Sequence, residues 1–320
     1  MKAFHSLRRI APRNQARRFD VLGLGCVAVD ELLYVNAWPP QDTKTPVIRR
    51  DRQCGGLTAT ALVAAARLGV RCAYAGVLGS DEPSRFVIET LKREGVNTSH
   101  IAIHGGARPV ASSIIVDHSA GTRNIFYSTL GVIGAGPRHP PKPLIRSSRV
   151  LFVDRFGMTG MIRAAHTARA AGVAVVADLE SSDVRGFAEL FGLVDHLIVS
   201  QEFALGFTGF NHPASAVARL LGQRGRQAVV VTCGSQGAWF QEKDWRLPTF
   251  HPAFPVKVVD TTGCGDVFHG AYAAGLAKGL PLAERIRLAS AAAAIKATQP
   301  GGQTGIPTAA EVNAFLRRRS

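Results

Sequence analysis

The sequence predicts an α/β protein with one mainly parallel central sheet, helices on both faces of that sheet and a smaller sheet beside it. Short apolar runs recur between helical stretches from residue 19 onward, an alternation typical of parallel sheets. The chain has 320 residues, of which 46% are hydrophobic, so it can bury one large core. Two segments with alternating side chains, 31–52 and 107–127, interrupt the pattern and predict the smaller sheet.

The first predicted element is a buried strand over residues 19–29 whose apolar run contains two glycines. A loose dinucleotide-binding fingerprint begins at Gly23, but that motif requires a helix to open at its third position. Residues 30–36 continue in a strand-like pattern, so a nicotinamide or flavin enzyme is the weaker alternative. Asp30 follows the strand and is a candidate ligand-binding carboxylate, or else a turn residue.

An alanine-rich helix is predicted next, opened by Gly55 and Gly56 and closed by Gly69. A glycine pair costs backbone entropy, and at a helix entrance it allows a ligand to approach the backbone closely. The segment 107–127 is then predicted as a β-hairpin, or alternatively as an extra edge of the main sheet. Arg123 lies in its second strand and is a candidate substrate contact.

The rest of the chain continues the β-α-β alternation. Strands are predicted at 71–77, 96–103, 150–154, 173–178, 196–199 and 228–232, with a helix at 81–94, a proline-rich loop at 137–143 and a last helix at 288–297. Ligands of open parallel sheets bind beyond the carboxyl ends of the strands. Those predicted ends carry Asp30, Asp154, Asp178, Thr232 and Asp260, although each aspartate alone could be a helix cap.

Residues 258–275 predict a strand end, a tight turn and the start of a helix. Gly263 and Gly265 let the backbone turn with exposed N–H groups, and such donors at a helix N-terminus attract a phosphate. Asp266 is unexpected in a site for an anion. A carboxylate there indicates a base that takes a proton from a hydroxyl as a phosphoryl group arrives; a helix-capping aspartate is the alternative.

Residues 260–266, Asp-Thr-Thr-Gly-Cys-Gly-Asp, closely resemble the C-terminal signature of the ribokinase-like (PfkB) carbohydrate kinases, Asp-Thr-x-Gly-Ala-Gly-Asp. Residues 55–69 resemble the N-terminal signature of the same family, with Thr60 where the family usually has Asn. That change puts the usual sugar contact in doubt. The resemblance extends over nearly the whole chain from residue 19, and it implies a three-layer α/β/α fold over 19–320 with a small β-sheet lid.

The resemblance also implies roles for individual residues. Asp266 would be the catalytic base, with an anion hole made by the N–H groups of Gly263, Cys264 and Gly265. The substrate would be bound by Asp30, Gly55, Gly56, Thr60 and Arg123. The nucleotide would be bound by Thr232, Gly234, Gly237, Thr262, Gly301 and Gly302. Glu202 would belong to a magnesium site. The resemblance further implies ATP and Mg²⁺ as cofactors, with a monovalent cation such as K⁺. It also implies a homodimer formed through the lid.

The function implied is transfer of the ATP γ-phosphate to a hydroxymethyl group of a sugar. Local likeness of residues 190–204 and 265–270 to the ketohexokinase and sulfofructose kinase branches favours a ketose. A nucleoside kinase on the same fold is the alternative. No Gly-x4-Gly-Lys-Ser/Thr loop is present, which excludes a P-loop kinase.

The formal net charge of +15 raises a second class of function, a non-catalytic nucleic-acid-binding protein on a kinase fold. Much of the charge is local, because residues 1–18 are basic without one acidic residue and are predicted to be a disordered extension. No nucleic-acid recognition motif supports a specific nucleic-acid partner. Five cysteines without a Cys-x-x-Cys pair fit a reducing cytoplasm, and no apolar run is long enough to span a bilayer.

Overall fold

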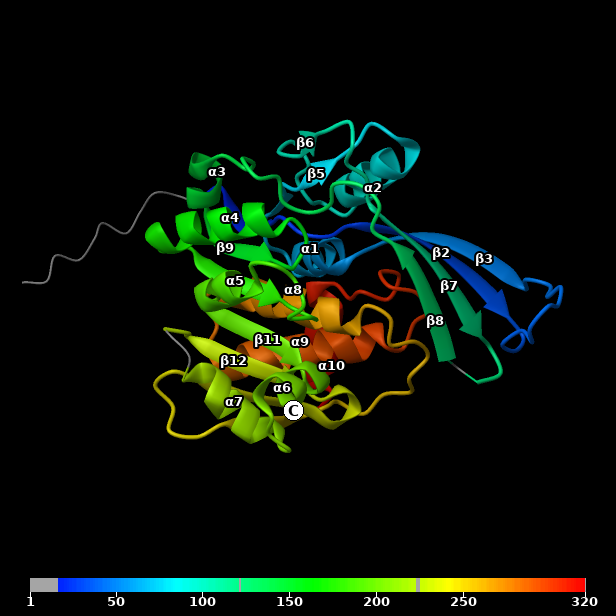
Figure 1. The fold of residues 1–320 in the computed structure, drawn as a ribbon. Helices are drawn as coiled ribbons and strands as arrows, with labels where there is room; N and C mark the ends of the chain where they lie inside the picture. The colour runs from blue at the N-terminus through cyan, green and yellow to red at the C-terminus, as the bar shows by residue number, and fades with distance from the viewer. Residues whose placement is uncertain (1–16, 121, 223–224, 320) are drawn as a thin grey trace, which may run out of the picture.

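The computed structural model describes residues 17–120, 122–222 and 225–319. In these residues a central eight-stranded sheet carries helices on both faces, and a four-stranded sheet projects from one end of this body (Figure 1). The predicted α/β/α class with a separate small sheet is therefore confirmed. The basic extension predicted at 1–18 lies almost wholly outside the described residues; of its last two residues, Arg17 donates hydrogen bonds to the carbonyl groups of Arg146 and Ala171.

The central sheet is parallel except at one edge. Its strands lie in the order β14 (Thr249–Pro252), β13 (Gly237–Glu242), β12 (Ala228–Thr232), β11 (His196–Ser200), β10 (Ala174–Asp178), β9 (Ser148–Val153), β1 (Phe19–Gly23) and β4 (Cys72–Tyr74). β13 and β14 are antiparallel, and the sequence did not predict them. They form the edge of the sheet beyond β12, where antiparallel pairing needs only short connections.

Alternate residues of the central strands feed two separate cores. In β1, Val21 belongs to the core beneath α1, α8 and α9, while Leu22 belongs to the core beneath α4, α6 and α7. The same alternation holds for Ile198 and Leu197 in β11. Because successive side chains of a strand point to opposite faces, a continuous apolar run is what a strand buried on both faces requires.

The helices divide into the two outer layers and a few peripheral elements. Their bounds are α1 (Leu57–Arg67), α2 (Glu82–Arg93), α3 (Lys142–Arg146), α4 (Met158–Ala170), α5 (Phe187–Leu193), α6 (Gln201–Thr208), α7 (Pro213–Leu221), α8 (Cys264–Ala277), α9 (Leu282–Lys296) and α10 (Ala309–Arg317). α1 and α8 pack on each other, α9 packs on α8, and α2 packs beside the small sheet (Figure 1).

The small sheet is built from the two segments for which it was predicted, 31–52 and 107–127. Its order is β3 (Arg49–Gly55), β2 (Ala28–Val35), β7 (Val110–Asp117) and β8 (Thr122–Ser128), with β7 and β8 antiparallel as predicted for the hairpin. Asp30 pairs with Gln53 and Ser112 across the sheet, whereas Glu31 pairs with Arg52 and Ser113. The two rows therefore lie on opposite faces, which we call the inner face (Asp30) and the outer face (Glu31).

Several predicted boundaries are wrong. The strand predicted over 19–29 is two elements, because the chain leaves the central sheet after Gly23 and enters the small sheet at Ala28; Asp30 therefore lies within β2 and not at the end of a central strand. Over 96–103 only the short β6 (Ala102–Ile103) forms, paired with β5 (Val77–Leu78). The last predicted helix begins six residues earlier, at Leu282.

The strand end predicted before Asp260 is also absent. Val258 and Val259 are exposed and belong to no strand. The N–H groups of Val259 and Asp260 instead donate to the carbonyl of Ala297, at 2.8 and 3.1 Å. The segment is thus fixed to the carboxyl end of α9, which supplies the acceptors that a neighbouring strand would have supplied.

Candidate active site

The candidate site lies at the edge formed by the carboxyl ends of β9, β10, β11 and β12. Asp154 follows β9, Asp178 ends β10, Ser200 ends β11 and Thr232 ends β12. Neighbouring strands lie ~4.8 Å apart, so this edge extends on the order of 15 Å from Asp154 to Thr232. α8 begins beside the end of β10, because its His269 Nδ1 lies 3.4 Å from Asp178 Oδ2.

Asp260 organises the turn that begins α8. Its Oδ1 accepts hydrogen bonds from the N–H and the hydroxyl of Thr262, at 2.7 and 2.6 Å, and its Oδ2 accepts one from the Gly301 N–H at 2.8 Å. Burial raises the pKa of this carboxyl, but these hydrogen bonds outweigh it, so the pKa lies below its ordinary value. Asp260 is thus an ionised link between the turn and the loop that follows α9.

The two glycines of the turn serve different needs. Gly263 has φ +74°, and a Cβ there would lie 2.6 Å from the Gly302 carbonyl oxygen, so conformation and packing both require glycine. A Cβ on Gly265 would meet nothing within 4 Å. Among the described residues, the Gly265 N–H has no acceptor, whereas the Cys264 N–H donates to the Thr261 carbonyl at 3.1 Å. The start of α8 therefore presents a free donor to open space.

Asp266 lies in the first turn of α8, partly exposed but closely surrounded by other acidic groups. Burial raises the pKa of its carboxyl well above the ordinary value, and repulsion from Asp178, Glu180 and Asp30 adds to the rise, while His269 opposes it. The pKa of Asp178 is raised by the same burial and repulsion. A carboxylate whose pKa is raised by its surroundings is a candidate general base.

The inner face of the small sheet brings Asp30 close enough to Asp266 for the two carboxylates to repel each other. The Ser112 hydroxyl hydrogen bonds to the Asp30 carboxyl, yet burial keeps the pKa of that carboxyl above its usual range. A Cβ on Gly55 would lie 2.0 Å from Asp30 Oδ2, and a Cβ on Gly56, which has φ +92°, would lie 2.7 Å from the Val27 Cα. Gly55 and Gly56 are thus needed because the protein's own atoms approach the backbone there. From the sequence alone, this need for space is attributed to a ligand.

Two side chains of the small sheet reach the α8 region. Arg123 Nη1 donates to the Thr261 hydroxyl at 3.2 Å and lies 3.9 Å from Asp260 Oδ1. Gln53 Oε1 accepts a hydrogen bond from the Gly302 N–H at 3.0 Å, and a Cβ on Gly301 would lie 2.3 Å from Gln53 Nε2. Gly301 and Gly302 therefore join the small sheet to the turn at Gly263.

Thr60 is buried in α1, and its hydroxyl accepts a hydrogen bond from Gln303 Nε2 at 3.2 Å. The hydroxyl therefore already has a partner within the protein. Thr60 contacts the loop that contains Gln303. A contact between Thr60 and the substrate stays a prediction.

The residues predicted to bind nucleotide phosphates form a second group on the same edge. Thr232 ends β12, Gly234 begins a short 3₁₀ turn, and Gly237 begins β13. Gly237 has φ +129°, and a Cβ there would lie 2.1 Å from the His251 carbonyl oxygen, so a side chain is excluded. Glu202 is exposed in the first turn of α6, directly after β11. The structure thus places Glu202 just after β11 and Thr232 at the end of β12, one and two strands away from Asp178 at the end of β10.

Lys296 is the residue of this region that sequence reasoning missed. It is fully buried at the end of α9, and its Nζ donates to the Asp260 carbonyl at 2.9 Å. Burial lowers the pKa of this ammonium, while Cys264, Asp260 and Asp266 favour its charged form. The signal was present, because Lys296 is the one charged residue in the predicted helix 288–297. The thiol of Cys264 is half-buried, and burial raises its pKa, so it is a packing group.

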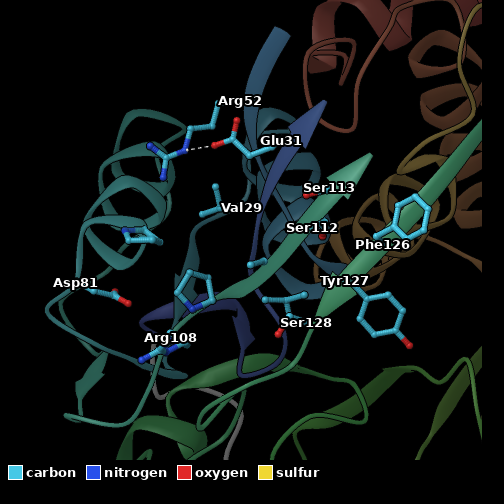
Figure 2. Close-up of a pocket in the computed structure, with 14 residues that line it drawn as sticks. Val29, Glu31, Arg52, Asp81, Arg108, Ser112, Ser113, Phe126, Tyr127 and Ser128 are labelled. Atoms are coloured by element: carbon cyan, nitrogen blue, oxygen red, sulfur yellow. Dashed lines mark ion pairs between the residues drawn. The ribbon is translucent and has the colours of Figure 1, made fainter. Parts of the chain in front are cut away.

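A cavity of about 540 Å³ lies elsewhere, against the outer face of the small sheet. Figure 2 shows Glu31, Arg52, Ser113 and Phe126 around it, with the Glu31–Arg52 ion pair dashed. These four residues belong to the outer-face row, and neither Asp30 nor Asp266 lines the cavity. In the described part of the chain no group of three or more His, Cys, Asp or Glu side chains forms a metal site, and no helix is long and apolar enough to cross a membrane.

An unpaired N–H group at a helix start, with a carboxylate of raised pKa in the next residue, is an arrangement suited to phosphoryl transfer. The family model described as "pfkB family carbohydrate kinase" matches residues 24–309. The chain therefore belongs to the pfkB family of carbohydrate kinases, which are phosphotransferases that act on sugar hydroxyl groups.

Individual relatives agree with this assignment. The chain is 29% identical to a ribokinase of Haemophilus influenzae over 82% of this chain and 87% of the relative. It is 28% identical to the probable fructokinase-4 of Arabidopsis thaliana, over 82% and 87%. A solved Arabidopsis thaliana ribokinase, complexed with ribose and ATP, shares the fold at a TM-score of 0.81, with 22% identity over 93% of this chain and 99% of that one.

Proposed function

We propose that this chain transfers the γ-phosphate of ATP to a hydroxymethyl group of a sugar, with a ketose as the favoured acceptor. The observation that carries the proposal is the start of α8, where the Asp266 carboxylate follows the exposed Gly265, whose N–H group has no acceptor among the described residues. A base and an anion site at one helix terminus are the two groups that in-line phosphoryl transfer to an alcohol requires.

In this mechanism Asp266 takes the proton of the acceptor hydroxyl. The N–H groups of Gly263, Cys264 and Gly265 bind the migrating phosphoryl, with the Cys264 N–H shared with Thr261. Asp30, held by Ser112, accepts hydrogen bonds from sugar hydroxyls. The other substrate residues in the proposal are Gly55, Gly56, Thr60 and Arg123.

The proposed nucleotide site runs along the sheet edge towards β12. Thr232, Gly234 and Gly237 would hold the phosphates, and Thr262, Gly301 and Gly302 would border the nucleotide from the other side. Mg²⁺ neutralises phosphate charge in such reactions and keeps several waters, so the exposed Glu202 carboxylate fits a water-mediated role. The solved Arabidopsis relative holds ATP, which supports ATP as the donor. The free cysteines of the described residues support the cytoplasm as the proposed location.

A monovalent cation is also expected near the loop after α9. The Lys296 ammonium already donates to the Asp260 carbonyl there. We therefore propose that Lys296 supplies this positive charge. Replacing K⁺ in the assay buffer by tetramethylammonium should then leave turnover within about twofold, and a loss beyond that would favour a bound ion.

The outer face of the small sheet supports the homodimer. Phe126 is exposed on this face, Trp38 stacks on it with ring centroids 6.5 Å apart, and Val47 and Ile48 are exposed beside the strands. Exposed apolar clusters of this kind mark association surfaces. We propose a second copy of this chain as the partner, and light scattering during gel filtration of the wild type and of Phe126→Asp checks it. A monomeric wild type would contradict it.

The acceptor is tested directly by assaying ADP release with fructose, ribose and adenosine at equal concentrations. A higher kcat/KM for fructose supports the ketose, and a higher value for adenosine supports the alternative nucleoside kinase. Salt-sensitive DNA binding without any turnover would favour the non-catalytic alternative.

The base is tested by Asp266→Asn. We expect normal folding and a loss of about 10³-fold in kcat, which is the scale of general-base catalysis. Asp244→Asn, on the exposed turn after β13, is the matched control and should keep wild-type turnover. Near-normal kcat in Asp266→Asn would falsify the assignment.

A further inference from the structure

His269 is a buried histidine one helical turn beyond Asp266 in α8. It is 5% exposed, and the ring of Phe152 from β9 packs against it edge-on, with centroids 6.3 Å apart. The proposed phosphoryl transfer does not use His269 directly. The position of His269 between Asp266 and the end of β10 makes the charge of its imidazole relevant to catalysis.

Both ring nitrogens of His269 face backbone carbonyl oxygens. Nδ1 lies 2.8 Å from the Gly265 oxygen, and Nε2 lies 3.1 Å from the Ile198 oxygen in β11. A carbonyl oxygen only accepts, and a neutral imidazole has one N–H. The two contacts are both hydrogen bonds only when the ring carries two protons. Asp178 Oδ2, 3.4 Å from Nδ1, adds a negative charge beside the same nitrogen.

The surroundings are strongly acidic. The charged groups that face this region are Asp154 after β9, Asp178 and Glu180 at the end of β10, Asp266 on α8, Asp30 on β2 and Lys296 on α9. Mutual repulsion among the carboxylates favours protonation of Asp266, and a protonated carboxyl cannot act as a base. A cation fixed next to Asp178 opposes that repulsion.

We propose that His269 is a positioning residue, held as an imidazolium between Gly265, Ile198 and Asp178, whose charge keeps the Asp266 carboxylate ionised at neutral pH. The inference rests on the proposed role of Asp266 as the base. His269 touches neither substrate, and it acts through the electrostatic potential at Asp266 and through the Gly265 carbonyl at the start of α8.

The protonation state is measured directly in the wild type. Long-range ¹H–¹⁵N spectra of the imidazole groups distinguish a doubly protonated ring, whose two nitrogens resonate close together, from a neutral ring, whose nitrogens are far apart. The His269 signals are those that disappear in His269→Asn. An imidazolium pattern at neutral pH is expected, and a neutral tautomer overturns the proposal whatever the role of Asp266.

The effect on catalysis is measured as the pH dependence of kcat/KM. Loss of the positive charge makes Asp266 harder to ionise, so the acidic limb of His269→Asn should move to higher pH by about one unit. Activity should fall about tenfold on the acidic side and recover at alkaline pH. His269→Gln provides a second neutral variant, and His166→Asn, at an exposed ion pair with Glu189, is the matched control.

A purely structural histidine gives a different result. Its removal would lower kcat/KM by the same factor at every pH, and that outcome overturns the proposal. Asp266→Asn separates this inference from the proposed function. Normal turnover of Asp266→Asn would refute the base, whereas a uniform loss in His269→Asn with an inactive Asp266→Asn would refute only the role of His269.

Discussion

The turn that begins α8 and the small sheet both border Asp266, but the protein fixes them very differently. In the turn, one carboxylate, Asp260, accepts three hydrogen bonds, and the fully buried Lys296 donates to its carbonyl. In the small sheet, every residue of β8 is exposed. Arg123 makes the hydrogen bond from this strand to the turn, and that side chain is itself one-third exposed.

The difference separates the chemistry from the choice of substrate. Groups that stabilise a transition state must be held within a fraction of an ångström, and the turn has the buried, charge-assisted bonds for that. An edge strand without buried residues, such as β8, separates at a lower free-energy cost, which suits the proposed role of this sheet in admitting and covering the sugar. Substitutions in each of the two regions test this division.

Of the substitutions that compare the two regions, Asp260→Asn should produce the largest effect. Whichever way the amide is turned, its NH₂ faces the Thr262 or the Gly301 N–H, so one donor loses its acceptor and meets another donor. We expect a loss of about 2 kcal/mol in the free energy of unfolding and of about 100-fold in kcat. Urea unfolding and steady-state kinetics measure both, with Asp244→Asn as the control; unchanged values would show that the turn is not held by Asp260.

The pH dependence of Asp260 has a defined sign. Its folded-state pKa is below the ordinary value, so the stability that it contributes is present above the unfolded-state pKa and is lost as the pH falls through the folded-state pKa. Asp260→Asn should therefore differ from the wild type in unfolding free energy at neutral pH and approach it in strong acid.

Lys296→Met should separate activity from stability. Methionine fills a similar volume without the cost of burying a charge, so we expect stability to be unchanged or higher. The anion site loses a nearby positive charge, and kcat should fall about tenfold. Lys278 also donates to a backbone carbonyl, that of Leu68, but at the other end of α8. Lys278→Met is therefore the matched control. Equal kcat in the two variants would show that the charge of Lys296 does not contribute to catalysis.

The two regions also differ in how much of their structure can be predicted from the sequence. The turn is local: Asp260, Gly263 and Asp266 lie within seven residues, so their spacing alone predicted a phosphate-binding helix start. Their supports, Lys296 and Gly301, arrive from more than thirty residues away. Such contacts depend on how α9 and its loop pack, which a local pattern does not contain.

In the small sheet the alternation predicted strands but not their pairing. Gln53 and Ser112 flank Asp30 only because β3 and β7 pair with β2 in one register, and a shift of one residue would turn every side chain to the other face. Sheet membership is hidden in the same way. The sequence predicts one strand over residues 19–29 because the apolar run is continuous, but the chain leaves the central sheet after Gly23 and enters the small sheet at Ala28. Register and sheet membership are tertiary properties.

Arg123→Gln should give the smallest effect. The guanidinium is partly exposed, so its hydrogen bond to Thr261 is worth about 1 kcal/mol or less, equivalent to about a fivefold change in binding. We expect the KM for the sugar to rise by about that factor with kcat unchanged, because only closure of the small sheet is weakened. Arg50→Gln, on the outer side of the same sheet and paired with Glu31, should alter neither. A fall in kcat in Arg123→Gln without a change in KM would mean that this sheet takes part in the chemistry, and the division between the two regions would then be wrong.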